Sequence, residues 1–493
     1  MKNICNSTLL VIILVTMLLS AGCNSTTSGQ KGIVTGVIQL EGETNHSGIV
    51  VSIYNAGIVP AELSQVQEEY PQLAFPIDDK LLFDHRQHDA LHSVFTDNEG
   101  NFSFPKLLYD KYIVAYSKEG WGCNYLFDIE LNSDEINITD KISNLYEETE
   151  IPSYIDGQYV LESRKCYVAK HDVVIGESGH LIMEANSRLL IDQNIKISSH
   201  GLISTPAGEE RVYITSYSGI YSGDLQSSNM GDGFYIYSGT NELSNISFSY
   251  LQNALQINRD DFSIECLSFN RCVFGLVARA MNEMSIGNCL FANCNDTNAA
   301  ACYAYDVQGL SASNNIFYGN HIAHKHEIVK NAVVSSNAYI ENDIGFQNLW
   351  ESTALFEHNY TVTEGSGVEN SGKSNLEILS NEIRTRIGVK TYSTSNWDDT
   401  PTLGWTKANN NNFDCEEYSV SCKAVYYFGG EPMPLNFKQN YWNSTSTAFI
   451  EASILDYYDL PPYDGPVHGG NYGIIEFLPF RNNSVADAGI QPR

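Results

Sequence analysis

The sequence is poor in basic residues. Of its 493 residues, 28 are Lys or Arg and 59 are Asp or Glu, so the formal net charge is −31 at pH 7. This shortage excludes ordinary nucleic-acid binding, because Lys and Arg displace the counterions of phosphates. An anionic membrane surface would repel the chain for the same reason. Charge is nevertheless sparse at 18%, and 43% hydrophobic residues are enough for a large folded core.

Long apolar runs are also scarce. The one pronounced run extends from Leu9 to Leu19, and Lys2 places a positive charge before it. It is too short to span a bilayer and is typical of the apolar part of an export signal. No later segment approaches the roughly 18 apolar residues of a membrane-spanning helix. We therefore expect residues 1–22 to be a signal peptide.

The predicted signal ends in small residues, Ser20-Ala21-Gly22, directly followed by Cys23. This ending resembles a bacterial lipobox. The resemblance implies cleavage before Cys23 and diacylglycerol on its sulfur, so membrane lipid would be a partner. Residue 24 is Asn rather than Asp, which in that family implies the outer membrane or cell surface if the cell is Gram-negative. Residues 23–31 would then be a polar tether.

The cysteines lack the spacing of a metal site. There is no CxxC, and no Cys/His spacing resembles structural zinc. Nine cysteines follow Cys23, so at least one thiol is unpaired within the chain. Export permits disulfides. Cys415 and Cys422, which bracket a short acidic segment expected to be a loop, are the best local candidates for a bridge.

Short alternating strands occupy residues 32–125. The segment from Phe95 to Phe104 is predicted to form a hairpin, with Asp-Asn-Glu-Gly as its turn. The successive patterns G-x-V, G-[IV]-x-V-x-I, T-D-x-x-G-x-F-x-F and Y-x-V resemble a carboxypeptidase-regulatory or transthyretin-like domain. The resemblance implies a small β-sandwich that acts as a spacer and carries no chemistry of its own.

An insertion at residues 56–93 interrupts this domain and contains three histidines. On a helix, the spacings of His85, His88 and His92 would place the imidazoles on one face, as metal binding requires. The alternative is a solvated polar helix or loop beside Asp84 and Asp89, and we favour that interpretation because a ligand set needs tertiary confirmation.

After a linker at residues 126–151, residues 152–480 form a series of three- to four-residue apolar segments separated by short turns. Strands this short are stable if the chain coils and each turn pairs with the one below. Five aromatic residues recur at spacings of 19, 22, 26 and 22: Tyr250, Phe269, Phe291, Phe317 and Tyr339. A period near 22 matches one turn of a parallel β-helix, in which like residues stack about 4.8 Å apart.

Asn or Cys follows each of these aromatic residues by three positions. Stacked Asn side chains are expected to bond one another and the turn backbone, as a buried polar ladder must. Cys272 and Cys294 are expected to stack as free thiols, since neighbours in register in a parallel sheet rarely bridge.

Both ends of the region carry further motifs. The segments from Tyr159 to Ser216 and the close Phe437-x-x-Asn440-Tyr441-Trp442 resemble the first coil and the last turns of right-handed parallel β-helix proteins of the pectate-lyase-like superfamily. The resemblance implies this fold over residues 152–480, with an irregular insertion at 345–430 and a tail at 481–493. The predicted fold class is therefore all-β, a small β-sandwich followed by a right-handed parallel β-helix.

Many such proteins cleave polysaccharides, so catalytic patterns matter. A lyase needs a base and cations beside a uronate carboxylate, but basic residues are sparse here. Ser199-His200-Gly201 and Arg386-Ile387-Gly388 do not match polygalacturonase motifs. The adjacent pairs Asp260-Asp261 and Asp398-Asp399 would point to opposite faces of a strand. No catalytic residue is assigned.

A second histidine cluster lies at His321 to His326. His324 and His326 would share one face of an extended strand and could bind a metal, although a solvated turn is the favoured interpretation. No cofactor is predicted. Acidic loops could bind Ca²⁺, but no D-x-D-x-D-G loop is present, so a Ca²⁺ site would rest on composition alone.

Trp397 and Trp405 lie in a polar stretch without repeats and are the candidate ligand-binding residues, since sugar rings stack on aromatic rings. The favoured function is a lipid-anchored cell-envelope protein whose β-helix is a non-catalytic structural or ligand-binding surface. A glycan partner would be neutral or metal-bridged, because the acidic chain repels anionic polymers. The alternatives are a carbohydrate-active enzyme with an unrecognised site, and an adhesin or scaffold for a protein partner.

Overall fold

The computed structural model describes residues 29–206, 208, 210–222, 229–240, 242–392, 405–422, 425–426, 433–456, 458–459, 470–471 and 473–491. Two units are formed. The first comprises Met1–Ala56, Asp89–Ser117 and Asn124–Asn144, and the second comprises Gly57–His88, Lys118–Cys123 and Leu145–Arg493. Within the described part of the chain, no helix is both long and apolar enough to cross a membrane.

The first unit is a small sheet domain, as predicted. One sheet has the strand order β4-β1-β7 and the other β3-β2-β5-β6. The strands are β1 (Lys31–Val37), β2 (Val50–Asn55), β3 (His92–Phe95), β4 (Asn101–Leu108), β5 (Asp110–Lys118), β6 (Gly122–Leu131) and β7 (Glu135–Asn137). The turn at Asp97 forms, but the predicted hairpin does not, because β3 pairs with β2 and β4 pairs with β1.

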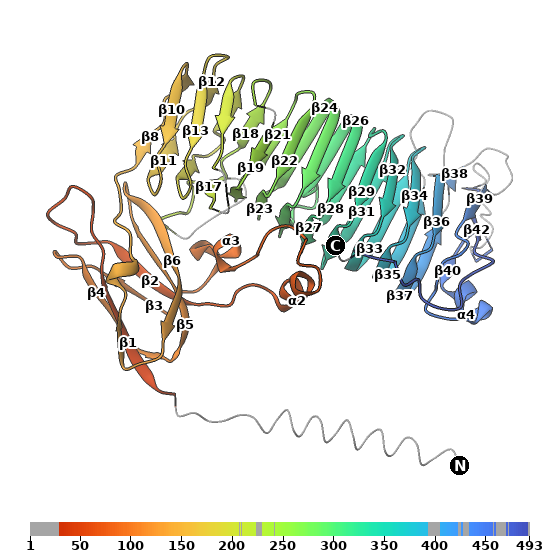
Figure 1. The fold of residues 1–493 in the computed structure, drawn as a ribbon, viewed down its shortest axis with the longest axis horizontal. Coiled ribbons are helices and arrows are strands. Elements are labelled where there is room, and N and C mark those ends of the chain that lie inside the picture. The colour runs from red at the N-terminus through yellow and green to blue at the C-terminus, as the bar shows by residue number, and fades with distance from the viewer. Residues whose placement is uncertain are drawn as a thin grey trace, which may run out of the picture. The chain divides into compact units, whose positions relative to one another are not determined.

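The second unit is a right-handed parallel β-solenoid of about 11 turns (Figure 1). Most turns contribute three short strands, and each strand pairs in parallel with the strand one turn later. The strands therefore form three faces along the solenoid. The prediction of an all-β chain with a parallel β-helix is confirmed.

The first face consists of β8 (Thr149–Glu150), β11 (Cys166–Ala169), β14 (Arg188–Ile191), β17 (Val212–Ser216), β20 (Ile246–Ser249), β23 (Ser268–Asn270), β25 (Leu290–Ala292), β27 (Ile316–Tyr318), β30 (Ala338–Ile340) and the starts of β33 (Tyr360–Ser371), β35 (Glu382–Tyr392) and β37 (Asn412–Cys422). The second face consists of β9 (Tyr154–Ile155), β12 (Val173–Ile175), β15 (Lys196–Ser199), β18 (Gly233–Ile236), β21 (Asn253–Ile257), the starts of β24 (Phe274–Gly287) and β26 (Cys302–Ser313), β28 (Ile322–Glu327), β31 (Ile344–Leu349), the ends of β33, β35 and β37, and β40 (Ile454–Leu455).

The third face consists of β10 (Gln158–Leu161), β13 (His180–Met183), β16 (Leu202–Ser204), β19 (Glu242–Ser244), β22 (Phe262–Glu265), the ends of β24 and β26, β29 (Ala332–Ser335), β32 (Thr353–Glu357), β34 (Asn375–Leu379), β36 (Trp405–Asn409), β39 (Met433–Asn436) and β42 (Gly473–Glu476). Helix α4 (Thr447–Ala452) precedes β40, and β38 (Val425–Tyr426) pairs with β41 (Gly470–Asn471).

A stack of aromatic rings fills the interior behind the first face. Phe248, Phe269, Phe291, Phe317 and Tyr339 follow one another in register, with ring centroids 5.3, 4.9, 4.8 and 4.8 Å apart. The predicted column is therefore correct except at its first member. Tyr250 does not belong to it, because its φ of 54° places it in the bend after β20.

Two ladders of asparagine line the bends beside this stack. The longer one has six members, all fully buried: Asn315, Asn337, Asn359, Asn381, Asn411 and Asn440. From Asn337 onward, each side-chain oxygen accepts from the backbone N–H and the side-chain amide of the preceding member. In the shorter ladder, Asn320 bonds Asn342, and Cys272 and Cys294 are buried free thiols. The predicted bonding of stacked Asn side chains is confirmed at Asn320 and Asn342, and the thiols are unbridged as expected. Asn253 does not join this ladder, because it lies in β21 and bonds Asp232.

In the described residues of 345–430, the chain is regular rather than irregular as expected: strands β31 to β37 continue all three faces. Residues 393–404, 423–424 and 427–430 of this range lie outside the described residues. The repeat is hard to see in the sequence because the step between some matching strands is 30 residues rather than 22, as from Asn375 to Trp405.

Residues 57–88, here called the strap, pack on the solenoid. The strap contains α2 (Ala61–Glu69), α3 (Asp79–Leu82) and the 3-10 turn η2 (His85–Gln87). Its buried apolar residues form one cluster with outward-facing residues of β25, β27 and β30. These are Leu63, Val66, Tyr70, Leu73, Leu81 and Leu82 on the strap and Leu290, Ala292, Ile316, Ala338 and Ile340 on the solenoid. The strap therefore covers the middle of the first face.

Replacing Asn359 by Ala tests the ladder. Its amide donates to Val334 O at 2.9 Å and to Asn381 Oδ1 at 3.1 Å, and its oxygen accepts from the backbone and the amide of Asn337. Because the substitution leaves several buried groups unpaired, we expect a loss of about 3 kcal/mol of unfolding free energy. Urea denaturation measures it. The exposed Asn375→Ala control should change stability by less than about 0.5 kcal/mol, and equal losses in the two variants would contradict the ladder.

Candidate ligand-binding surface

A shallow groove crosses the third face at β29, β32, β34 and β36. These strands are labelled in Figure 1. Period-2 alternation buries Val334, Phe356, Ile378 and Ala408 and turns their neighbours outward. The outward residues form two columns in register. One is Asn331, Thr353, Asn375 and Trp405, and the other is Val333, Leu355, Glu377 and Lys407.

The groove has a volume of about 440 Å³ and ends at Trp405, whose side chain is 48% exposed. Four adjacent strands about 4.8 Å apart give it a length of about 14 Å. This length is suited to an extended ligand of several units.

The lining of the groove is electrically balanced. The Lys407 ammonium lies 2.6 Å from the Glu377 carboxylate, so the two charges compensate each other. The remaining lining offers amides, a hydroxyl and apolar surface. An exposed indole, apolar floor and neutral hydrogen-bonding groups are the features that bind the faces and hydroxyls of sugars.

The other predicted ligand-binding residue, Trp397, lies outside the described residues, as does the predicted lipidation site Cys23. The structure therefore places one of the two tryptophans. Trp405 is an outward residue of a regular strand rather than part of an irregular stretch.

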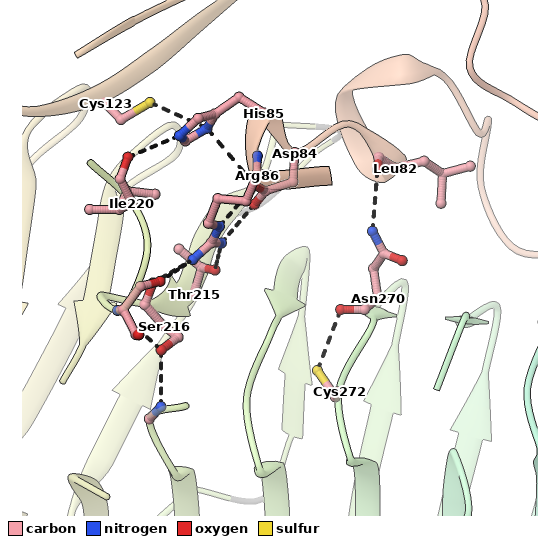
Figure 2. A network of polar contacts seen from close by, with 12 residues as sticks. Leu82, Asp84, His85, Arg86, Cys123, Thr215, Ser216, Ile220, Asn270 and Cys272 are labelled. Carbon is pink, nitrogen blue, oxygen red and sulfur yellow. Dashed lines mark hydrogen bonds and ion pairs between the residues drawn. The ribbon is translucent and has the colours of Figure 1, made fainter. Parts of the chain in front are cut away.

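The end of the strap is held by a buried ion pair (Figure 2). Arg86 Nη2 lies 2.7 Å from Asp84 Oδ2, and both residues are buried. The guanidinium also donates to Ser216 O at 2.9 Å and to Thr215 Oγ1 at 2.8 Å, and it lies over the ring of Tyr250 at 4.4 Å. Burial disfavours ionisation of Asp84, but the charge and hydrogen bonds of Arg86 outweigh burial and lower its pKa.

His85 lies between the two members of this pair in the sequence and contacts a thiol (Figure 2). Its Nε2 lies 2.9 Å from Ile220 O, and its Nδ1 lies 4.0 Å from Cys123 Sγ. Burial alone would lower the pKa of His85 and raise that of Cys123. Their mutual attraction reverses both shifts, so the pKa of His85 is raised and that of Cys123 is lowered. Cys123 is 2% exposed and is therefore not an accessible nucleophile. The contact between His85 and Cys123 instead joins the strap to the start of β6.

His85, His88 and His92 do not share the helical face considered for metal binding. The 3-10 turn covers only His85–Gln87. His88 stacks on Phe83 at 5.3 Å, and burial followed by the charge of Arg271 lowers its pKa. His92 lies in β3 of the first unit and is exposed. Across the described residues, no group of three or more His, Cys, Asp or Glu is arranged to hold a metal.

The predicted disulfide between Cys415 and Cys422 does not form. Both thiols are free and lie in one strand, β37, where the sequence suggested a loop. Extended residues advance about 3.3 Å each, so the Cα atoms lie beyond the roughly 7 Å limit of a disulfide.

His324 and His326 share a face, as predicted, but that face is the interior rather than a solvated turn. Both lie in β28, are fully buried, and place their Nε2 atoms 3.0 Å apart. His324 also lies 3.4 Å from the Tyr339 hydroxyl, and His326 Nδ1 has no partner. Burial lowers the pKa of His324 to about 3 and lowers that of His326 as well. Both imidazoles are therefore neutral core residues.

The adjacent carboxylates give no acid/base couple. Asp260 and Asp261 are both exposed, and Asp260 accepts a hydrogen bond from the backbone of Asn282 at 3.1 Å. The pair Asp398-Asp399 lies outside the described residues.

These features define a parallel β-solenoid with one strapped face and one grooved face. The chain matches no protein-family model, no curated protein and no solved structure. The assignment of a function therefore depends on the geometry of the groove.

Sequence reasoning missed most of the groove. Its lining was not recognised, although Asn331, Thr353 and Asn375 are spaced by 22 residues, the same period as the aromatic column. Aligning the sequence on that period and keeping the residues that alternate with the core would have found both columns. The step from Asn375 to Trp405 is 30 residues, so a 22-residue alignment does not place Trp405 in this column.

Replacing Arg86 by Met tests the buried pair. Removal of one partner leaves the Asp84 carboxylate buried and uncompensated, so we expect a loss of about 3–5 kcal/mol. Urea denaturation of the full chain measures the loss. The double variant Asp84→Leu/Arg86→Met should recover most of it, because no lone charge remains. If the two single substitutions simply add, the pair is not coupled.

Acid titration tests the buried histidines. Above pH about 6.5 both the folded and the unfolded chain keep His324 neutral. Below it the unfolded chain binds a proton that the folded chain excludes until pH about 3, so stability falls as the pH drops. Between pH 7 and 5 we expect a loss of about 2 kcal/mol per buried histidine. Urea denaturation at both pH values should show a smaller loss for His324→Phe than for the exposed control His171→Gln. Equal losses would contradict the neutral interior pair.

Proposed function

We propose that this protein binds a neutral, extended polysaccharide in the groove of the third face, without cleaving it. The single observation that carries the proposal is the register of Trp405 with a column of polar residues on three preceding strands. The groove thus combines a stacking platform with hydrogen-bonding groups at intervals of about 4.8 Å.

The charge of the groove supports a neutral ligand. The chain as a whole carries −31, which disfavours acidic polymers. The groove itself holds one carboxylate, Glu377, and its partner Lys407 compensates it. Binding should therefore depend little on salt, whereas a metal-bridged acidic polymer would be released by a chelator.

The location of this activity is part of the proposal. The ending of the signal in Cys23 supports a lipid anchor in the cell envelope, and the small sheet domain would act as a spacer between the anchor and the solenoid. The solenoid would then present its third face to glycans outside the cell. Globomycin sensitivity and mass spectrometry of the N-terminal peptide test the anchor independently of the ligand.

Replacing Trp405 by Ala tests the groove. A glycan array followed by calorimetry with a neutral oligosaccharide hit gives the affinity. We expect Trp405→Ala to weaken binding at least tenfold, because a stacking ring contributes about 1–3 kcal/mol. Replacing the exposed Tyr305 of the second face by Ala is the matched control and should leave the affinity unchanged.

Two outcomes of the same assay would contradict the proposal. Equal affinities of Trp405→Ala and the unmodified protein would show that the ligand does not bind in the groove. Release of reducing sugars from the hit by the unmodified protein would show an enzyme instead of a binding protein.

A further inference from the structure

The groove on the third face has two chemically different walls. The outward column Asn331, Thr353 and Asn375 carries two amides and a hydroxyl on successive strands. The opposite column begins with Val333, which is 37% exposed, and the half-buried Leu355. One wall can therefore form hydrogen bonds through its side chains, whereas the facing part of the other wall cannot.

The floor between the two walls is apolar as well. Ala332, Ala354 and Leu376 alternate with the wall residues along their strands and also line the groove. The short side chains of the two alanines leave space between the walls on the first two strands. A substituent that protrudes from the ligand can therefore reach Val333 and Leu355.

An unmodified hexose polymer would match only the polar wall. It carries hydroxyl groups along both edges of its chain, so one edge would face Val333 and Leu355. Hydroxyl groups on that edge would lose water without gaining hydrogen bonds, which is unfavourable. A methyl group on the same edge would be removed from water against apolar side chains, which is favourable. The apolar wall therefore favours a sugar with a substituent that ends in a methyl group.

The amides of the polar wall indicate what joins this methyl group to the sugar. Asn331 Nδ2 donates to Gln308 O at 3.3 Å, which leaves its side-chain oxygen as an acceptor, and Asn375 is exposed. A side-chain amide complements an acetamido group, because each has an acceptor oxygen and an N–H donor. Asn331 and Asn375 lie two strands apart, or about 10 Å. In an extended 1,4-linked chain, successive sugars turn opposite edges to a wall, so equivalent groups recur at every second unit.

The charges of the groove fit a neutral amide better than a free amine or an acid. The Lys407 ammonium and the Glu377 carboxylate lie 2.6 Å apart and compensate each other. No other charged side chain is found among the described residues that line the groove. Because acetylation keeps an amino sugar uncharged, such a ligand brings no charge for which the groove lacks a partner.

We propose that the groove binds a polymer of N-acetylated amino sugars in an extended, 1,4-linked chain. This inference rests on the proposed function, since it names the substrate class of the same site. Acetamido groups on one edge of the chain exchange hydrogen bonds with Asn331 and Asn375. Those on the other edge pack their methyl groups on Val333 and Leu355. The exposed indole of Trp405 stacks on a sugar ring at the end of the groove.

Calorimetry with two matched hexasaccharides tests the substrate class in the full-length chain without its signal. N-acetylchitohexaose and cellohexaose are both neutral and have the same linkage. They differ only in the acetamido group that replaces one hydroxyl of each unit. We expect N-acetylchitohexaose to bind at least tenfold more tightly than cellohexaose, and Trp405→Ala to weaken its binding at least tenfold.

Substitutions in the apolar wall test where the methyl groups pack. Val333→Thr and Leu355→Asn introduce polar groups at nearly constant volume. We expect them to weaken binding of N-acetylchitohexaose about threefold and at least fivefold, respectively, without weakening that of cellohexaose. Leu202→Asn, at an exposed position of the third face outside the groove, is the control and should leave both affinities unchanged. Because unfolding would weaken both ligands alike, the ratio of the two affinities reports specificity alone.

The outcomes separate this inference from the proposed function. Equal affinities of the two hexasaccharides would overturn the N-acetyl specificity and leave the groove as a glycan site. The same holds if N-acetylchitohexaose does not bind but a glycan without acetamido groups binds in a Trp405-dependent way. An unchanged affinity ratio in both Val333→Thr and Leu355→Asn would also overturn it. Absence of any glycan whose binding needs Trp405 would remove both proposals.

Discussion

The parallel pairing of each strand with the strand one turn later is the constraint on which the structure depends. Once the register is set, residues separated by 22 or by 30 positions stand about 4.8 Å apart in one column. Inward columns become the aromatic stack and the asparagine ladders. Outward columns form the apolar surface on which the strap packs and the groove that ends at Trp405. One repeat therefore serves the core, the docking of a distant segment and the candidate ligand site.

The few basic residues are used in three different ways. Arg86 is paired inside the protein with Asp84 and holds the strap. Lys407 is paired at the surface with Glu377 and keeps the groove neutral. Arg211 is buried and donates from both Nη atoms to the Cys266 carbonyl. In a chain with net charge −31, the partner of each cation indicates its role, because a charge without compensation is costly only where water is excluded.

The fold class and the interior were largely predictable because their signals are periodic. The ladder from Asn315 to Asn337 follows a 22-residue step that the sequence shows directly. The sequence-based predictions were wrong where a residue lies in a bend rather than in the strand, and where the spacing between matching strands changes from 22 residues. Tyr250 was placed in the column although a bend carries it, and residues 345–430 were judged irregular although 30-residue steps preserve the register. The docking of the strap was not predictable, because Leu63 meets residues more than 200 positions away.

The central claim is that the third face holds the ligand, and hydroxyl-radical footprinting tests it most directly. The full-length chain without its signal would be oxidised with and without a saturating neutral oligosaccharide, and modified residues would be quantified by mass spectrometry. The account predicts that the ligand protects Trp405 and Leu355 in the groove and leaves Tyr305 on the second face unchanged. Protection of Tyr305 with continued oxidation of Trp405 would contradict it.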